Sequence, residues 1–180
     1  MSATVLMAED EKNLADVYTM WLSANYEVQT AYDGEEALRQ FSDDVDAVLL
    51  DRRMPKFSGD EVLKALRDHG FEGPIGMVTA VDPDFDIIEM GFDDYIVKPI
   101  MKEDLLAFVD DLLALRGYEN AVQRYYELAS KKAALESNKT RDELSDSEEY
   151  QALVVELDEV RQAAQTATDG ASAADLFSNL

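Results

Sequence analysis

The sequence predicts an α/β fold with a doubly wound parallel sheet of five strands, followed by an α-helical hairpin. Five short apolar runs rich in β-branched residues alternate with stretches in which apolar residues recur at helical spacing. The runs are continuous, which is typical of strands buried on both faces of a parallel sheet. After residue 117 only helical patterns follow. We therefore expect an α/β domain at residues 1–117 and a helical hairpin at residues 118–180.

The expected elements of the α/β domain follow one another in a regular order. Strands are predicted at residues 4–8, 26–31, 45–50, 75–79 and 95–97, and helical spacing at 14–22, from 34 onward, around 62–69, at 85–90 and at 102–116. Asp33 can accept hydrogen bonds from the free N–H groups of a helix start. Gly70 stands where a helix stops, and imidazole at His69 suits the negative end of the helix dipole.

Composition excludes several kinds of site. The 180 residues suffice for one ordinary domain with an appendage. The absence of cysteine excludes disulfides and thiolate sites, and the single histidine excludes a site that needs two imidazoles. No apolar run approaches the roughly 20 residues of a membrane span. The N-terminus also lacks the basic region followed by an apolar stretch that is typical of a signal peptide. We expect a soluble cytoplasmic protein with no membrane partner.

The chain is strongly acidic along its whole length. Asp and Glu number 39 against 16 Lys and Arg, a formal charge of −23. Such a surface repels phosphate backbones, so direct nucleic-acid binding is disfavoured. An evenly acidic, lysine-poor surface suits a halophilic cytoplasm, where molar salt screens self-repulsion. An acidic protein of an ordinary cytoplasm is the alternative.

Polar residues end the predicted strands, at the edge where open parallel sheets bind ligands. Glu9 and Asp10 end the first strand and Asp51 ends the third, so three carboxylates converge. Clustered oxygen ligands suit a hard divalent cation, and Mg²⁺ is the natural occupant. Lys98 adds an ammonium group and Thr79 a hydroxyl. This set of groups fits phosphoryl transfer, in which an aspartate can be the nucleophile.

Residues 3–117 resemble the receiver domain of two-component response regulators. The matching segments, in the family's order and spacing, are Val-Leu-Met-Ala-Glu9-Asp10-Glu11, Val-Leu-Leu-Asp51-Arg-Arg-Met-Pro55 with Gly59, Met-Val-Thr79-Ala80 and Gly91-Phe-Asp-Asp-Tyr95-Ile-Val-Lys98-Pro99. The resemblance implies a flavodoxin-like sheet of strand order 2-1-3-4-5. It also implies a phosphoacceptor switch that is not an enzyme beyond self-catalysed phosphotransfer and autodephosphorylation.

The resemblance implies how the acids act. Asp51 would accept a phosphoryl group from a histidine of a sensor histidine kinase. Asp10, Asp51 and the backbone carbonyl of Arg53 would ligate Mg²⁺, and Glu9 would contribute through water.

It also implies roles for the remaining residues at the strand ends. Lys98 would contact the phosphoryl oxygens, and Thr79 would move toward them on phosphorylation. Tyr95 would be the rotameric switch that reports this movement at the face of the fourth helix, fifth strand and fifth helix. The small Ala80 fits beside a phosphoryl group, and Lys98-Pro99 would be a cis peptide.

Two departures and two rival classes bear on this interpretation. Glu9 replaces the family's commoner aspartate, and Arg53 and Val81 occupy the positions that tune dephosphorylation, so the phosphoryl lifetime stays open. A haloacid-dehalogenase-type phosphatase would need a second aspartate where Arg53 stands. Nucleotide binding is disfavoured because no G-x-G-x-x-G or P-loop follows a strand.

The C-terminal region predicts two helices, at 118–137 and 145–167, around a polar linker at 137–144. A heptad seam runs through Tyr150, Leu153, Leu157, Val160, Ala164 and Ala167, and the first helix repeats it at Tyr118, Ala121, Tyr125, Leu128, Lys132 and Leu135, with Lys132 as an interruption. Thr140 with Glu143, and Ser145 with Glu148, fit capping boxes. We expect residues 168–180 to fray, with Leu176 and Phe177 able to dock.

A lone two-helix hairpin buries little apolar surface, so it needs the α/β domain, a second copy or a partner to cover it. In composition and position it resembles the HalX domain, a helical module that follows receiver domains in haloarchaeal proteins. We expect an output or dimerisation module, with a homodimer formed on phosphorylation and a downstream protein of unknown identity.

The alternative is a transcriptional regulator whose C-terminal helices contact DNA. Only six basic residues stand in that region, with Lys131, Lys132, Lys139 and Arg141 near the predicted hairpin tip.

Overall fold

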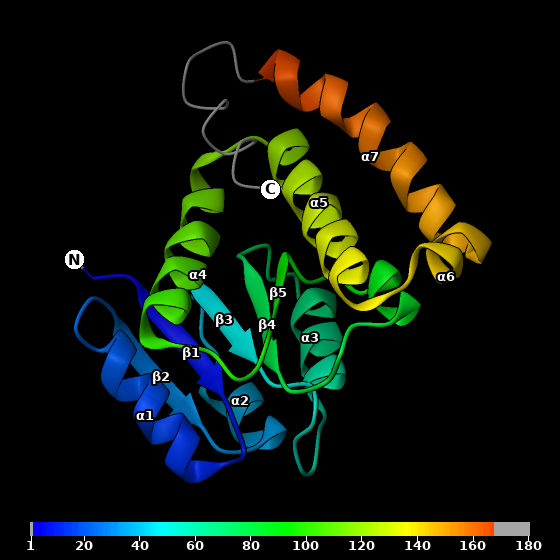
Figure 1. Cartoon of the computed structure of the whole chain (residues 1–180). Coiled ribbons are helices and arrows are strands. Elements are labelled where there is room, and N and C mark those ends of the chain that lie inside the picture. Colours follow the sequence, from blue (N-terminus) through cyan, green and yellow to red (C-terminus); the bar gives the residue numbers. More distant parts are fainter. Residues whose placement is uncertain (1, 168–180) are drawn as a thin grey trace.

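The computed structural model describes residues 2–167 and forms a sheet flanked by helices, with a hairpin along one edge (Figure 1). The strands are β1 (Thr4–Ala8), β2 (Glu27–Ala31), β3 (Ala47–Leu50), β4 (Ile75–Thr79) and β5 (Asp94–Val97). All neighbouring strands are parallel, in the order β2-β1-β3-β4-β5. The predicted fold class and strand order are confirmed.

Helices cover both faces of the sheet. They are α1 (Lys12–Leu22), α2 (Gly34–Gln40), α3 (Gly59–Asp68), the 3₁₀ helix η1 (Phe85–Glu89), α4 (Lys102–Ala114) and the 3₁₀ turn η2 (Leu115–Gly117). Helices α1 and α4 pack with Val5, Met7 and Leu49, whereas α2 and α3 pack with the alternate positions Leu6 and Leu50. Strands that are apolar on both faces therefore place one core on each side of the sheet.

The short stretch predicted at residues 85–90 is the 3₁₀ helix η1, not a full α-helical layer element. It lies between β4 and β5 in the chain. Its hydrogen bonds close tighter rings than those of an α-helix, and carbonyl groups at its end need other donors. This short helix leaves room at the β5 edge of the sheet.

The hairpin fills that edge. It consists of α5 (Asn120–Asn138), α6 (Arg141–Asp146) and α7 (Glu148–Ala167). Helix α5 contacts β5 and η1 on one side and α7 on the other, and α7 also contacts η1 (Figure 1). The sequence left open whether the α/β domain, a second copy or a partner covers the hairpin, and the structure shows that the α/β domain does.

The seam of the second hairpin helix is covered within the chain. Tyr150, Leu153 and Ala164 are buried, and Leu153 is only 1% exposed. These three residues are therefore covered within the chain, because α5 and η1 contact α7. The side chain of Ala167 and the expected fraying of residues 168–180 lie outside the described residues.

The hairpin turn differs from the prediction in one cap. Thr140 and Glu143 form the predicted capping box at the start of α6. The predicted box at Ser145 is wrong, because Ser145 lies inside α6 and its hydroxyl donates to the Asp142 carbonyl. Instead, the Ser147 hydroxyl accepts a hydrogen bond from the Tyr150 amide and starts α7. A short helix thus occupies the expected polar linker.

Among residues 2–167, no helix is both long enough and apolar enough to span a bilayer.

Candidate functional site

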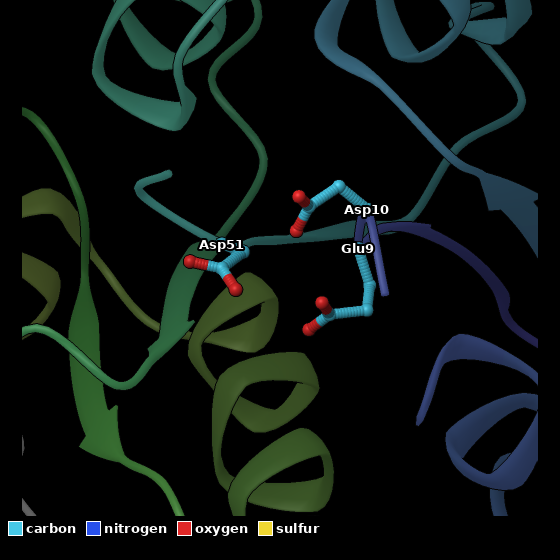
Figure 2. Close-up of side chains that lie close together, drawn as sticks. All are labelled: Glu9, Asp10 and Asp51. Atoms are coloured by element: carbon cyan, nitrogen blue, oxygen red, sulfur yellow. The ribbon is translucent and has the colours of Figure 1, made fainter. Parts of the chain in front are cut away.

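Three carboxylates meet where β1 and β3 end. Glu9 and Asp10 follow β1 and Asp51 follows β3, and one oxygen from each lies within 4.8 Å of the others (Figure 2). The sheet ladder sets this arrangement, because the Asp51 amide donates to the Ala8 carbonyl and the Glu9 amide to the Ala31 carbonyl. Glu9 and Asp51 are buried, and Asp10 is exposed. The predicted convergence of the three acids is present.

Lys98 joins this cluster from the end of β5. Its Nζ lies 2.6 Å from Oδ2 of Asp51 and also forms an ion pair with Glu9. Burial alone would lower the pKa of Lys98, but hydrogen bonds to Asp51 and Glu9 outweigh burial and raise it above its ordinary value. Burial raises the pKa of Glu9 despite its bond to Lys98. The lysine therefore stays charged and offsets part of the carboxylate repulsion.

The other oxygen of Asp51 is held by two donors. The Thr79 hydroxyl lies 2.9 Å from Oδ1, and the Arg53 amide lies 3.1 Å from the same atom. Thr79 Oγ1 in turn accepts from the Val81 amide at 3.2 Å. These bonds fix the orientation of the Asp51 carboxylate, so a reacting oxygen is presented without a search of side-chain rotamers.

Gly59 lets the loop after Asp51 close. A Cβ at this position would lie 2.0 Å from the Asp51 carbonyl oxygen, and the Gly59 amide donates to the Arg52 carbonyl at 2.9 Å. Only glycine permits so close an approach of α3 to the loop. Ser58 then caps α3 with a capping box to Glu61.

Tyr95 is buried on β5 and its hydroxyl donates to the Val81 carbonyl at 2.6 Å. The same short loop therefore contacts Thr79 through the Val81 amide and Tyr95 through the Val81 carbonyl. Lys98-Pro99 is a cis peptide, as expected.

The donor set fits a hard divalent cation. Three carboxylates offer oxygen ligands only, and the exposed Asp10 leaves the cluster open to water, which Mg²⁺ retains in its shell. Arg53 stands beside the cluster in the loop after Asp51, and the ligation by its carbonyl stays a prediction.

Sequence reasoning missed Arg52. This residue directly follows Asp51, and its guanidinium makes a two-bond pair with Asp60 at 3.0 and 2.8 Å and a third bond to Asp86 at 2.6 Å. Its position beside Asp51 was visible in the sequence, but its partner Asp86 is 34 residues away.

Comparison with known proteins identifies the class of this domain. The family model of the response regulator receiver domain matches residues 5–110, more than half of the chain, and that of the HalX domain matches residues 114–180. The chain belongs to the response regulator receiver domain family. It carries a HalX domain after the receiver.

Individual relatives agree with this assignment. A Haloferax volcanii protein, whose name marks it as a candidate transcriptional regulator, is 44% identical over 158 residues, which are 87% of this chain and 27% of that protein. The alkaline phosphatase synthesis transcriptional regulatory protein PhoP of Bacillus subtilis is 37% identical over 118 residues, 63% of this chain and 49% of PhoP. This chain thus spans about a quarter of the first relative and half of the second.

A solved structure shows the same fold. The Borrelia burgdorferi CheX–CheY complex with BeF₃ and Mg²⁺ matches with a TM-score of 0.57 and 25% identity, over 61% of this chain and 87% of that one.

Proposed function

We propose that the protein is a response regulator that accepts a phosphoryl group on Asp51 from a histidine of a sensor histidine kinase. The observation that supports this most is the Asp51 carboxylate itself, held by Thr79 on one oxygen and by Lys98 on the other. An ordinary surface aspartate has no such set of donors. Lys98 and Thr79 are the groups that a transferred phosphoryl would meet.

The proposed step balances as a displacement at phosphorus. A carboxylate oxygen of Asp51 attacks, a P–O bond forms, and the P–N bond to the kinase imidazole breaks, with the imidazole leaving. Lys98 offsets the charge that gathers on the phosphoryl oxygens, and the Thr79 hydroxyl turns from Asp51 toward them. The acyl phosphate is later lost to water, so the protein acts as a switch with at most self-catalysed turnover.

Mg²⁺ is the proposed cofactor. Asp10, Asp51 and the Arg53 carbonyl would hold it directly, and Glu9 through water. Bound there, the ion would neutralise charge on the phosphoryl group. The solved CheY complex of Borrelia burgdorferi contains Mg²⁺ and BeF₃, which supports this assignment.

We propose that Thr79 and Tyr95 relay phosphorylation to the hairpin, which would act as the output module and bind a downstream protein. The division into a receiver at 1–117 and an output hairpin at 118–180 is part of this proposal. A homodimer on phosphorylation is also part of it. A wild type that sediments as a monomer at tens of micromolar, with and without beryllofluoride, would contradict the dimer.

DNA binding by the hairpin is the second candidate, because the names of both relatives refer to transcription. The charges oppose it. Arg124, Lys131, Lys132 and Lys139 each form an ion pair with a carboxylate. Binding of a labelled duplex with an affinity that falls as the salt concentration rises would favour this candidate over a protein partner.

The phosphoacceptor assignment is tested by intact mass after incubation with acetyl phosphate. We expect one added phosphate on the wild type, none on Asp51→Asn and little when EDTA is present, whereas Asp44→Asn, an exposed acid away from the cluster, should label like the wild type. Full labelling of Asp51→Asn, or labelling that EDTA does not reduce, would contradict the proposal.

A further inference from the structure

The 3₁₀ helix η1 is held by side chains from two directions. From the phosphoacceptor loop, Arg52 binds Asp86 on η1 while it also binds Asp60 at the start of α3. The Arg52 side chain is only 10% exposed. The guanidinium thus ties η1 to the segment that begins at Asp51.

From the hairpin, two lysines hold the same helix: Lys131 lies in α5, and Lys139 directly follows it. Lys131 Nζ donates to the carbonyls of Ile88 at 2.9 Å and Met90 at 2.6 Å, at the C-terminal end of η1. Lys139 forms an ion pair of 2.9 Å with Asp84, the residue that caps the N-terminal end. Both ends of η1 are therefore fixed by the hairpin.

The helix has few bonds of its own. A five-residue 3₁₀ helix has only one or two turns, so its position is set by what it contacts. Burial raises the pKa of Tyr95, and the nearby guanidinium of Arg52 opposes this rise. The guanidinium therefore reaches the proposed switch residue as well as η1.

We propose that Arg52 is a positioning residue that couples the state of Asp51 to the output hairpin by holding η1 through Asp86. This inference rests on the proposed phosphorylation of Asp51. A change in the backbone next to Asp51 moves the guanidinium, and Asp86 carries the change into η1. Lys131 and Lys139 bind η1 from the hairpin, so the change reaches α5. Arginine suits this place because its planar fork binds two carboxylates at once, and a lysine presents one compact charge.

The test removes the ion pair between Arg52 and Asp86 by changing Asp86, the partner that lies on η1 and not next to Asp51. Asp86 is 54% exposed, so Asp86→Asn removes the charge with little change in packing, and Asp86→Glu restores it. Glu89→Gln, an exposed acid on the same helix, is the matched control. Each full-length variant is kept in acetyl phosphate and Mg²⁺, its phosphorylation is measured by intact mass, and hydrogen exchange of peptides from α5 is followed in the same sample.

In the wild type we expect phosphorylation to change exchange in α5 several-fold. Asp86→Asn should take up phosphate as the wild type does but lose the change in α5, while Asp86→Glu and Glu89→Gln keep it. The inference is overturned if Asp86→Asn changes α5 as much as the wild type per phosphoryl group, or if phosphorylated wild type leaves α5 unchanged. A wild type that takes up no phosphate at Asp51 overturns the proposed function, and this inference with it.

Discussion

Lys98, partly buried at the end of β5, and Lys131, buried on α5, are surrounded by different groups. Two carboxylates, of Asp51 and Glu9, face Lys98 and raise its pKa despite its burial. Lys131 meets one carboxylate, of Glu127, and two backbone carbonyls, so burial prevails and lowers its pKa. The ammonium of Lys131 also lies over the ring of Phe92.

The difference shows that the two regions are built by different forces. At the strand ends, charges of both signs face one another and remain open to water and ligands on one side. Between receiver and hairpin, Lys131 donates to the carbonyl groups at the end of η1, and its ammonium lies over the ring of Phe92. The first region is suited to chemistry, and the second to holding two parts of the chain together.

Removing the buried lysine of the hairpin should have the largest effect on stability. Lys131→Ala leaves the Ile88 and Met90 carbonyls without their donor and Glu127 without its partner, and should lower the free energy of unfolding by about 3–5 kcal/mol. Lys132→Ala, its neighbour with a more exposed pair to Glu136, should cost below about 1 kcal/mol. Urea unfolding measures both. Equal losses would show that Lys131 does not hold the interface.

The apolar part of the same interface is tested by Leu153→Ala. Leu153 is 1% exposed, so the cavity should cost about 2–5 kcal/mol. Val155, on the same helix, is 60% exposed, and Val155→Ala should change stability by within about 0.5 kcal/mol. Thermal and urea unfolding in molar KCl compare the two variants. A Leu153→Ala protein as stable as Val155→Ala would mean that α7 does not stay packed in solution.

Asp94 contrasts with the acids at the strand ends, because burial beside α5 raises its pKa to about 6 from 3.8. The Tyr126 hydroxyl donates to it at 2.7 Å. Its neutral form fits the folded state better, so Asp94 destabilises the protein progressively as pH rises from about 4 through 6.

Asp94→Asn does not titrate and keeps an acceptor for Tyr126. It should therefore be more stable than the wild type at pH 7, by up to about 3 kcal/mol, and no more stable below pH 4. Urea unfolding at a series of pH values gives the difference. A difference that does not vary with pH would contradict the raised pKa.

Salt should change the stability of the folded protein as a whole, and not that of one region. With a net charge of −23, self-repulsion weakens as the Debye length falls from roughly 10 Å at 0.1 M to 3 Å at 1 M. The melting temperature should rise over that range of KCl. A flat or falling melting temperature would remove the halophilic interpretation.

The strand-end region could be predicted from the sequence, and the reason is local. Parallel strands bring their carboxyl ends to one edge, so Glu9, Asp51 and Lys98 were placed together by the order of strands alone. The same argument included Thr79 at the end of the fourth strand, and the structure places it against Asp51. The family resemblance then added Tyr95.

The hairpin interface could be predicted only in part. The heptad pattern found the two helices and the buried positions Tyr150, Leu153 and Ala164 of the second. In the first helix only Leu128 and Leu135 of the predicted seam are buried, and the pattern marked Lys132 as its interruption. The buried lysine is instead Lys131, whose partners are backbone carbonyls 41 and 43 residues away. The pattern of side chains in a sequence does not show which backbone carbonyls lack a hydrogen-bond donor. The pair of Arg52 with Asp86 was hidden for a similar reason, since neither charge is unusual in so acidic a chain.

The central claim is that Asp51 carries the phosphoryl group, and chemical trapping tests it most directly. After incubation with acetyl phosphate and Mg²⁺, borohydride reduces an aspartyl phosphate to homoserine, and peptide mass mapping then finds the converted residue. We predict homoserine at position 51 alone, at a yield that follows the phosphate seen by intact mass. Conversion of another acid, such as Asp10, with Asp51 left unchanged would contradict the account.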